Sequence, residues 1–363
     1  MQRQEQPLRR GWTTGTCATA AAKAAFTALV TGDFPDPVEV TLPRGERPSF
    51  ALAMTRSEGE AASAGVIKDA GDDPDVTHGA LVLATVRLGK PGAGVTFRAG
   101  PGVGMVTRAG LPVPPGEPAI NPVPRRMIGD AIEEVAAAYG RAADAEIEIA
   151  ISGGEALAAR TLNGRLGIVG GLSILGTTGV VIPYSCSAWI HSIHRGIDVA
   201  RAAGLVHIAG ATGSASEAAI RKLHGLPEIA LIDMGDFVGG MLKYVRAHPL
   251  PRVTIAGGVG KITKLAQGLT DLHSKRGAVD NASLAAFARA GGGSAELCAR
   301  ILAANTAAEA FALAKAEGIA LGDLVARAAK ATAERLVAGR DIGIEIAVFD
   351  RDGALVGRAP FDS

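Results

Sequence analysis

The sequence predicts a two-domain chain, in which an α+β region is followed by a smaller α/β region with a parallel, Rossmann-like sheet. Three observations lead to this fold class. The chain has 363 residues, which is long for one domain of the usual ~100–200 residues. Its first half holds short strand-like runs with few helices, and its second half repeats strand, glycine-rich loop and helix. These patterns are typical of α+β and α/β folds respectively. We therefore expect domains at residues 1–184 and 185–363.

The first half opens with a well-marked helix. Thr13, Thr14 and Thr16 precede an Ala-rich run, Cys17–Val30, and Gly32 follows it. Hydroxyl residues favour a helix start and glycine favours a helix end. A second helix is expected from Pro124 to Tyr139, because proline is common in the first helical turn. Strands are expected at Val38–Leu42, Ser49–Thr55, Gly65–Ile67, Ala80–Leu88, Val95–Arg98 and Ala145–Ile151.

The second half contains three apolar strands, Leu205–Ala209, Ile229–Asp233 and Val253–Ala256. Each one runs into a glycine-containing loop and then a helix, which predicts a parallel sheet with ligand-binding groups at the carboxyl ends of its strands. Two Ala-rich helices, Ser294–Ala316 and Leu321–Leu336, are expected next. A terminal hairpin turns at residues 350–353, and its pairing partner does not follow from the sequence.

Composition excludes several classes of protein. The chain has 37 basic and 36 acidic residues, a net charge of +1, whereas nucleic-acid-binding proteins usually carry a basic excess. Its three cysteines are distant from one another and form no CxxC pair. This pattern argues against a disulfide framework and a common zinc site, so we expect no metal and a reducing, cytoplasmic location.

Two segments imitate export or membrane signals. Arg9 and Arg10 precede the Ala-rich run in the manner of a twin-arginine signal, but Lys23 interrupts the apolar stretch, so we interpret it as a helix. The uncharged stretch Leu166–Ile190 is long enough to span a bilayer. Its five glycines and Pro183 favour a buried, turn-rich loop. We expect a soluble protein without a membrane partner.

Two glycine-rich loops of the second half suggest an anion and an adenosine-type ligand. The segment Gly257–Thr263 lacks the spacing of a nucleotide-binding P-loop, yet a glycine-rich helix start still offers N–H groups to an anion, beside Lys261. The segment Gly210–Gly213 also lacks the complete dinucleotide motif. However, an acidic residue ends the next strand twenty residues later, where it can bind ribose hydroxyls. The cofactor-binding candidates are Gly210, Gly213, Asp233 and Gly235.

The N-terminal helix start is a candidate site for a carboxylate or phosphate. Thr13, Thr14 and Thr16 gather three hydroxyls there, directly after Arg9 and Arg10, and the helix dipole favours an anion. One of the threonines is expected to be only the helix cap. Cys17 lies at the same helix end. Because no base is evident beside it, we interpret it as a packed thiol rather than a nucleophile.

An acidic turn, residues 68–75, places four carboxylates and Lys68 after a strand. Crowded carboxylates repel one another unless cations or hydrogen bonds hold them, so Asp69 and Asp72 are candidates for a general base or an orienting group. The alternative is a solvated turn, in which aspartate is common. His191 and His194 have metal-ligand spacing but no third ligand, so we expect a solvent-facing pair.

Taken together, the motifs resemble one family, the cobalt-precorrin-5B C(1)-methyltransferases or CbiD family. The resemblance begins with RGWTTGTCA at Arg10–Ala18 and extends in order to about residue 270. The remaining C-terminal part is similar only in general character. The other matching segments are Val66–Thr77, Gly116–Arg125, Leu166–Gly179, Met234–Gly239 and Gly257–Ala266.

The resemblance implies an S-adenosylmethionine-dependent methyltransferase of cobalamin biosynthesis. It would methylate carbon 1 of cobalt-precorrin-5B and give cobalt-precorrin-6A, with cobalt entering only as part of the substrate. The implied fold has two domains, α+β and then α/β. No catalytic residue of the family is carried over.

The residues fit such chemistry. The acetate and propionate arms of a corrin-like tetrapyrrole need scattered cations and hydrogen-bond donors. The candidates are Arg10, Thr13, Thr14, Thr16, Lys68, Arg125 and Lys261, with Arg9, Arg126 and Lys264 as further cations. Methyl transfer from a sulfonium depends on orientation and desolvation and needs no enzyme nucleophile. Asp69, Asp72 or Asp236 would steady the sulfonium charge or move a proton on the macrocycle.

Two alternatives stay open. One is a nicotinamide-dependent oxidoreductase, which the incomplete dinucleotide motif disfavours. The other is a non-catalytic corrinoid carrier, which would keep the carboxylate-binding groups without a cofactor site. The sequence also leaves open whether the chain forms a homo-oligomer.

Overall fold

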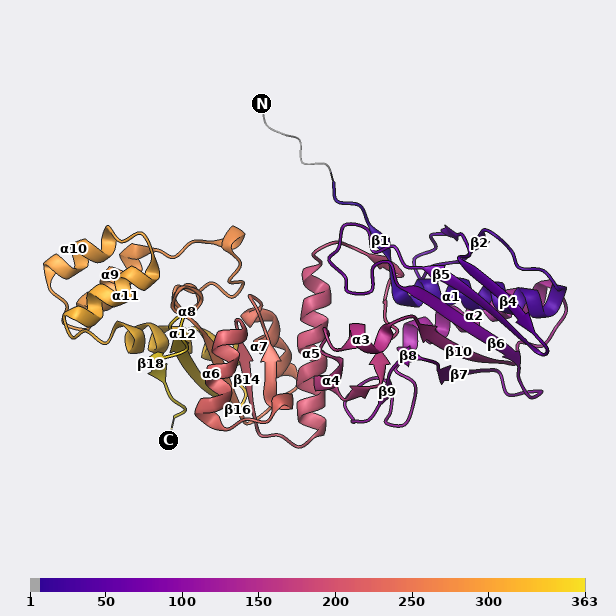
Figure 1. Ribbon diagram of the computed structural model, residues 1–363. Coiled ribbons are helices and arrows are strands. Elements are labelled where there is room, and N and C mark those ends of the chain that lie inside the picture. The colour runs from indigo at the N-terminus through magenta and orange to yellow at the C-terminus, as the bar shows by residue number, and fades with distance from the viewer. Residues whose placement is uncertain (1–6, 363) are drawn as a thin grey trace, which may run out of the picture. The chain divides into compact units, whose positions relative to one another are not determined.

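The computed structural model describes residues 7–362. The chain divides into two compact units, Met1–Cys186 and Ser187–Ser363, and each is described by itself (Figure 1). Between residues 7 and 362, no helix is both long and apolar enough to cross a membrane. The uncharged stretch Leu166–Ile190 instead holds three short strands and the start of helix α5 (Cys186–Ala202). The stretch is not buried throughout, since Leu175 and Ile182 are about half exposed.

The first unit is built on a five-stranded sheet with the order β4-β5-β6-β10-β7. Four of the strands are antiparallel, and β7 is parallel to β10. Side chains along β6 and β10 alternate between buried and partly exposed, because successive residues of a strand point to opposite faces. The strands are β4 (Met54–Glu58), β5 (Ala61–Ile67), β6 (Leu81–Leu88), β7 (Val95–Ala99) and β10 (Ala145–Ile151).

Helix α1 (Thr14–Thr31) forms the centre of the first unit. It contacts β5 and β6 as well as helix α2 (Pro122–Ala138). Thirteen of its 18 residues are buried. Alanine allows this, because its small side chain lets the sheet and α2 approach the helix axis closely. The predicted caps are confirmed: the Thr13 side chain accepts a hydrogen bond from Thr16 N, and Gly32 ends the helix with a left-handed φ of 92°.

The rest of the first unit consists of short pairs of strands and two short helices. The predicted strand Ser49–Thr55 is two separate elements, since β3 pairs with β2 and β4 joins the large sheet. The pairs are β1 (Gly11–Trp12) with β13 (Val180–Val181), β2 (Val38–Glu39) with β3 (Ser49–Phe50), β8 (Gly102–Val103) with β12 (Gly171–Leu172), and β9 (Met105–Val106) with β11 (Ile168–Val169). The helices are α3 (Gly154–Ala158) and α4 (Asn163–Leu166).

The second unit contains a five-stranded sheet with the order β15-β14-β16-β17-β18. Strands β15, β14, β16 and β17 are parallel, and β18 returns antiparallel to β17. The C-terminal hairpin is therefore part of this sheet and pairs with β16. The strands are β14 (His207–Ala211), β15 (Leu231–Asp233), β16 (Arg252–Gly258), β17 (Gly343–Phe349) and β18 (Leu355–Ala359).

Helices cover both faces of the second sheet. Helix α6 (Ser214–His224) packs Ile220 against Ala209, Ala256 and Ala347 on one face. On the other face, the isoleucines of the strands pack against α5, α7, α8 and α12. Helices α9 to α11 form a group beside α8 (Figure 1). The remaining helices of this unit are α7 (Val238–Ala247), α8 (Val259–Ala266), α9 (Asn281–Ala290), α10 (Ala295–Leu302), α11 (Ala307–Ala316) and α12 (Leu321–Val337). Two 3-10 turns, η1 (Glu228–Ala230) and η2 (Ser274–Arg276), complete the unit.

The single helix predicted over Ser294–Ala316 is wrong. The chain forms α10 and α11 with a break between them. Thr306 caps α11 by accepting a hydrogen bond from Glu309 N at 3.1 Å, and the Glu309 carboxylate accepts one from Asn305 N at 2.8 Å. This local competition for the backbone N–H groups starts a new helix where the Ala-rich pattern alone predicts continuation.

Candidate functional site

Three loops of the second unit meet at the carboxyl edge of its sheet. The backbone N–H groups of Met234 and Gly235 both donate to Ala211 O at 3.1 Å, and Thr212 N donates to Ala256 O at 3.0 Å. These bonds join the loop after β15 to the end of β14, and the loop after β14 to the last part of β16. In open α/β sheets, ligands bind at this edge.

A pocket of about 320 Å³ opens beside these loops. Its charged groups are one carboxylate and two ammonium groups, and α8 and the loop after α8 supply most of its wall. The residues that line it are Asp236, Gly260, Lys261, Lys264, Leu272, His273 and Ser274. Of the residues singled out in the sequence, Asp236, Lys261 and Lys264 meet here.

Both lysines of the pocket are held in place by backbone carbonyl groups. Lys264 Nζ donates to Leu272 O at 3.0 Å, and Lys261 Nζ donates to Thr212 O at 3.2 Å. Lys261 Nζ also lies 2.7 Å from Asp236 Oδ1. That approach is an ion pair without hydrogen-bond alignment, so Asp236 Oδ1 is buried without a hydrogen-bond donor. A buried carboxylate oxygen has a strong preference for such a donor.

The N-terminus of α8 adds a positive partial charge. Gly258 is the cap residue and no side chain caps this helix end, so its first N–H groups and the helix dipole favour an anion. The pocket thus combines a place for an anion with a carboxylate that accepts a cation. A free amino acid end, with one carboxylate and one ammonium, has this charge pattern.

Trp189 lies over the end of β15, and the sequence gives no signal for it. Its indole Nε1 donates to Asp233 O at 3.0 Å, and its ring packs on Gly235, where an added Cβ would lie 3.3 Å from the indole. Gly235 has a φ of +55°. Trp189 is 47% exposed, so one part of the indole is available to a ligand.

The two glycines expected at the cofactor site lie in different environments. Gly213 is the cap residue of α6 and an added Cβ there would meet no atom within 4 Å. Gly210 is inside β14, and an added Cβ would overlap the Met241 sulfur. The glycine at 210 is therefore explained by core packing rather than by an open edge.

In the first unit, the acidic turn holds the N-terminal segment. The Arg9 guanidinium forms an ion pair with Asp69, and Arg9 N donates to Asp72 Oδ2 at 2.6 Å. Trp12 N donates to Asp69 O at 2.7 Å. The hydrogen bond from Arg9 lowers the pKa of Asp69 to about 2. A carboxyl with so low a pKa is a weak general base.

The rest of the turn is also occupied by internal partners. The Lys68 side chain is 1% exposed and forms an ion pair with Asp75. Asp75 Oδ1 accepts hydrogen bonds from Thr77 N at 2.7 Å and Thr77 Oγ1 at 2.6 Å, and its pKa is lowered despite its burial, by Lys68 and these bonds. Lys68 is therefore a buried ammonium that neutralises a partly buried carboxylate, and it is not directed at solvent.

The threonines at the start of α1 are buried and used for packing. Thr16 Oγ1 donates to Gly179 O at 2.7 Å and lies 3.1 Å from Thr13 Oγ1. Gly15 N donates to Leu175 O at 3.1 Å. Thr14 is 5% exposed. This helix start is thus closed by the chain itself.

Arg125 and Arg10, both candidates for binding the substrate, differ in whether their guanidinium groups have partners within the protein. Arg125 donates from Nε to Ile120 O at 2.8 Å and from Nη2 to Pro118 O at 3.0 Å and Glu117 Oε2 at 3.1 Å. Its guanidinium is consequently engaged in a local loop. Arg10 is exposed and forms no ion pair within residues 7–362, which leaves its charge available to a ligand.

The histidine pair on α5 is part of a ring stack. The rings of His191 and His194 lie 6.3 Å apart, and His194 stacks on Tyr244 at 3.8 Å, which in turn stacks on His248 at 4.1 Å. Burial lowers the pKa of His194. His191 is exposed but His194 is not, so the expectation of a solvent-facing pair is correct for one ring only.

Cys17 is fully buried, and its burial raises the pKa of the thiol to about 12. We expect iodoacetamide to modify the exposed Cys186 in the folded chain while Cys17 and the buried Cys298 remain unmodified, because the thiolate is the reactive form. Peptide mapping by mass spectrometry measures this directly, with the urea-unfolded chain as the control. Modification of Cys17 as fast as Cys186 would contradict the packed-thiol interpretation.

Comparisons with family models and with known proteins all indicate the same family. The family model "CbiD" matches residues 1–183 and the model "CbiD, C-terminal domain" matches residues 271–360. A protein of Agrobacterium fabrum named cobalt-precorrin-5B C(1)-methyltransferase is 63% identical over 99% of this chain and 94% of its own length. A protein of Methylorubrum extorquens with the same name is 63% identical over 96% and 97%. A crystal structure of a cobalamin biosynthesis protein (cbiD) from Archaeoglobus fulgidus is 28% identical, with a TM-score of 0.41 over 74% of this chain and 83% of that one.

Proposed function

Because the chain belongs to the CbiD family, we propose that it transfers a methyl group from S-adenosylmethionine to carbon 1 of cobalt-precorrin-5B, giving cobalt-precorrin-6A in cobalamin biosynthesis. The observation that carries this proposal is the sequence identity of 63%, over nearly the whole chain, to relatives whose name states this activity. No feature of the described residues favours the oxidoreductase or the carrier over it.

The chemistry sets modest demands on the protein. Bound S-adenosylmethionine supplies an electrophilic methyl group on a positively charged sulfur. The chain has to hold the two reactants in line and exclude water, and it has no need of a nucleophile of its own. The burial of Cys17, with its raised pKa, agrees with that requirement.

We place the amino acid end of the cofactor in the pocket at the carboxyl edge of the second sheet. The buried Asp236 oxygen, which lacks a donor, would accept the cofactor ammonium. Lys261, Lys264 and the uncapped start of α8 would hold its carboxylate. Of the three carboxylates expected to act in the reaction, Asp236 is the one that lines this pocket.

The adenosine is assigned to the neighbouring strand ends. Asp233 ends β15, where an acidic side chain can bind ribose hydroxyls, and Gly213, at which an added Cβ would meet no atom within 4 Å, leaves room for close approach. Gly235 supports the indole of Trp189. The exposed part of Trp189 offers a flat surface for the adenine. This assignment treats residues 185–363 as a Rossmann-like domain, supported by four parallel strands and helices on both sheet faces.

The macrocycle arms require cations with free hydrogen-bond donors. In the first unit Arg10 fits this role best, since it is exposed and unpaired within the described residues. Thr13, Thr16, Lys68 and Arg125 have internal partners. We assign Asp69 and Asp72 to holding the Arg9–Trp12 segment, and thereby Arg10, in position.

We further propose that the protein acts in the reducing cytoplasm, because its three cysteines are free thiols.

The test is a single-turnover assay with purified full-length protein, cobalt-precorrin-5B and S-adenosylmethionine that carries a labelled methyl group. Mass spectrometry is expected to find one labelled methyl on the macrocycle. Binding of the macrocycle without transfer of label would favour the carrier and overturn the proposal. Stabilisation of the fold by NADH but not by S-adenosylhomocysteine would favour the oxidoreductase.

A further inference from the structure

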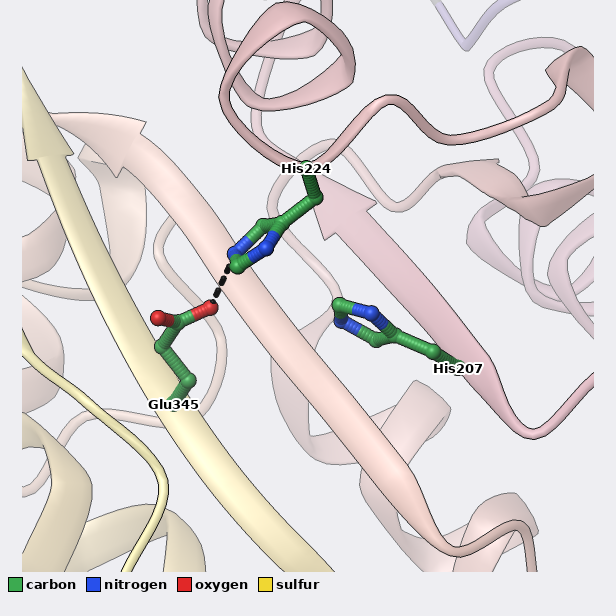
Figure 2. A group of neighbouring side chains, drawn as sticks. All are labelled: His207, His224 and Glu345. Carbon is green, nitrogen blue, oxygen red and sulfur yellow. Dashed lines mark hydrogen bonds and ion pairs between the residues drawn. The ribbon is translucent and has the colours of Figure 1, made fainter.

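A cluster of two imidazoles and a carboxylate lies on the α6 side of the second sheet, away from the pocket. His207 begins β14, His224 ends α6 and Glu345 lies in β17 (Figure 2). One ligand atom of each residue lies within 4.8 Å of the others. No sequence motif predicts the cluster, because His207 and His224 are 17 positions apart and Glu345 follows His224 by 121 positions.

The fold brings these residues together for a simple geometric reason. Side chains alternate along a strand, so His207 shares a sheet face with Ala209, and Glu345 shares it with Ala347; both alanines pack against α6. Helix α6 follows β14 and runs back along the sheet, which returns His224 to the amino end of the strands. The cluster is therefore at the amino ends of the strands, opposite the edge that carries the pocket.

The carboxylate is oriented by its neighbours. Glu345 is 0% exposed. Arg358 contacts only one of the two carboxylate oxygens, Oε1, with its Nε at 2.8 Å and its Nη2 at 2.7 Å from that atom. The Thr254 hydroxyl donates to Oε2 at 2.6 Å. Oε2 thus faces the imidazoles, and His224 Nε2 lies 2.6 Å from it. Secondary groups that fix a ligand oxygen in this way are a common part of metal sites.

We propose that His207, His224 and Glu345 bind one divalent transition-metal ion of the zinc class through two imidazole nitrogens and one carboxylate oxygen. Two nitrogens and one oxygen are a donor set that Zn²⁺ accepts, with water in the fourth position. Tetrahedral ligand atoms at bonds of about 2.1 Å lie about 3.4 Å apart. The cluster meets this spacing after small side-chain rotations, since its atoms lie within 4.8 Å.

The hydrogen bonds within the cluster define what must change when an ion binds. Thr254 gives its single hydrogen to Glu345, so His207 Nε2, at 2.8 Å from Thr254 Oγ1, is the donor to that hydroxyl. Coordination requires the Nε2 lone pair, and therefore the hydrogen moves to Nδ1 or leaves. The His224 hydrogen that now faces Glu345 likewise moves to Nδ1 or is released to solvent, and the ion takes its place. The His224 side chain is 17% exposed, which gives the ion access from solvent.

Such an ion would join β14, α6 and β17, which are distant in the sequence. It would bind the folded chain and not the unfolded one, and so raise the melting temperature. This role is separate from methyl transfer. The inference therefore stands or fails independently of the proposed function.

The experiment uses full-length protein that has been freed of metal with a chelator. Zn²⁺ is titrated by calorimetry, and Co²⁺ is followed by its visible absorption. We expect saturable binding of one ion per chain, and a strong Co²⁺ band typical of four or five ligands. His224→Gln is expected to lower the Zn²⁺ affinity at least about tenfold. His191→Gln, an imidazole on α5 outside the cluster, is expected to leave it unchanged.

Three results would overturn the proposal: no saturable uptake by the wild-type chain, a Co²⁺ spectrum that stays that of the aqueous ion, or equal Zn²⁺ affinity in His224→Gln and wild type. The last would mean that the cluster is only a closed hydrogen-bond network. Circular dichroism checks that the variant is folded. If His224→Gln does not fold, His207→Gln takes its place with the same expected loss of affinity.

Discussion

Asp236→Asn is expected to weaken the binding of S-adenosylmethionine and S-adenosylhomocysteine by roughly 10- to 100-fold. The substitution removes the negative charge that we assign to the cofactor ammonium, and hydrogen bonds to charged groups contribute about 1.5–3 kcal/mol, where about 1.4 kcal/mol equals a factor of ten. Isothermal titration calorimetry on the full chain measures both affinities. Equal losses for the two ligands would identify the ammonium, because S-adenosylhomocysteine lacks the sulfonium charge but keeps the amino acid end.

Two controls define that result. Adenosine has no amino acid end, so its affinity is expected to be the same in Asp236→Asn and wild type. Asp271→Asn changes a nearby carboxylate that does not line the pocket: its Oδ2 lies 3.4 Å from Arg276 and its Oδ1 accepts a hydrogen bond from His273 N at 3.2 Å. Asparagine keeps an oxygen that can accept this bond, so the variant is expected to leave all three affinities unchanged. A loss confined to S-adenosylmethionine would instead assign Asp236 to the sulfonium. An equal loss for adenosine would contradict the assignment of the cofactor's amino acid end to this pocket.

Gly71→Ala is expected to destabilise the first unit by about 3 kcal/mol or more. Gly71 has a φ of +68°, and an added Cβ would overlap the carbonyl oxygen of Arg9. The left-handed conformation costs a non-glycine residue about 1–2 kcal/mol, and overpacking costs about 1–3 kcal/mol more. Urea denaturation measures the free energy of unfolding. Limited proteolysis reports whether the Arg9–Trp12 segment is released.

Gly79→Ala is the matched control. Gly79 follows in the same loop with a similar φ of +76°, but an added Cβ there would meet nothing within 4 Å. It should therefore show only the backbone cost of about 1–2 kcal/mol. Equal losses in the two variants would mean that the contact between Gly71 and the N-terminal segment contributes nothing to stability.

The regular elements followed from local signals in the sequence. The start and end of α1 were predicted by a cluster of three threonines, of which Thr13 is the cap, and by Gly32; β10 was predicted from its alternating polarity over Ala145–Ile151. Local signals sufficed because caps and alternation act within a few residues. They failed between α10 and α11, where a cap inside an Ala-rich run starts a new helix.

The sites were predicted less well, since their contacts join distant segments. The acidic turn suggested catalytic carboxylates, but the partner of Asp69 is Arg9, 60 residues away, and no rule of spacing connects them. Lys261 and Asp236 were named separately and meet in one pocket. His273, which completes the wall, and Trp189, which covers the neighbouring strand end, carried no motif at all.

The burial of α1 on nearly all sides has a consequence for dynamics. An amide of its central turns can exchange with solvent deuterium only when the sheet and α2 separate from it, which is close to unfolding of the whole unit. We therefore expect the amides of Ala18–Phe26 to be among the slowest to exchange in the chain. The motif at residues 10–18 is thereby attached to the most slowly opening part of the first unit, so that its geometry persists while the surrounding loops fluctuate.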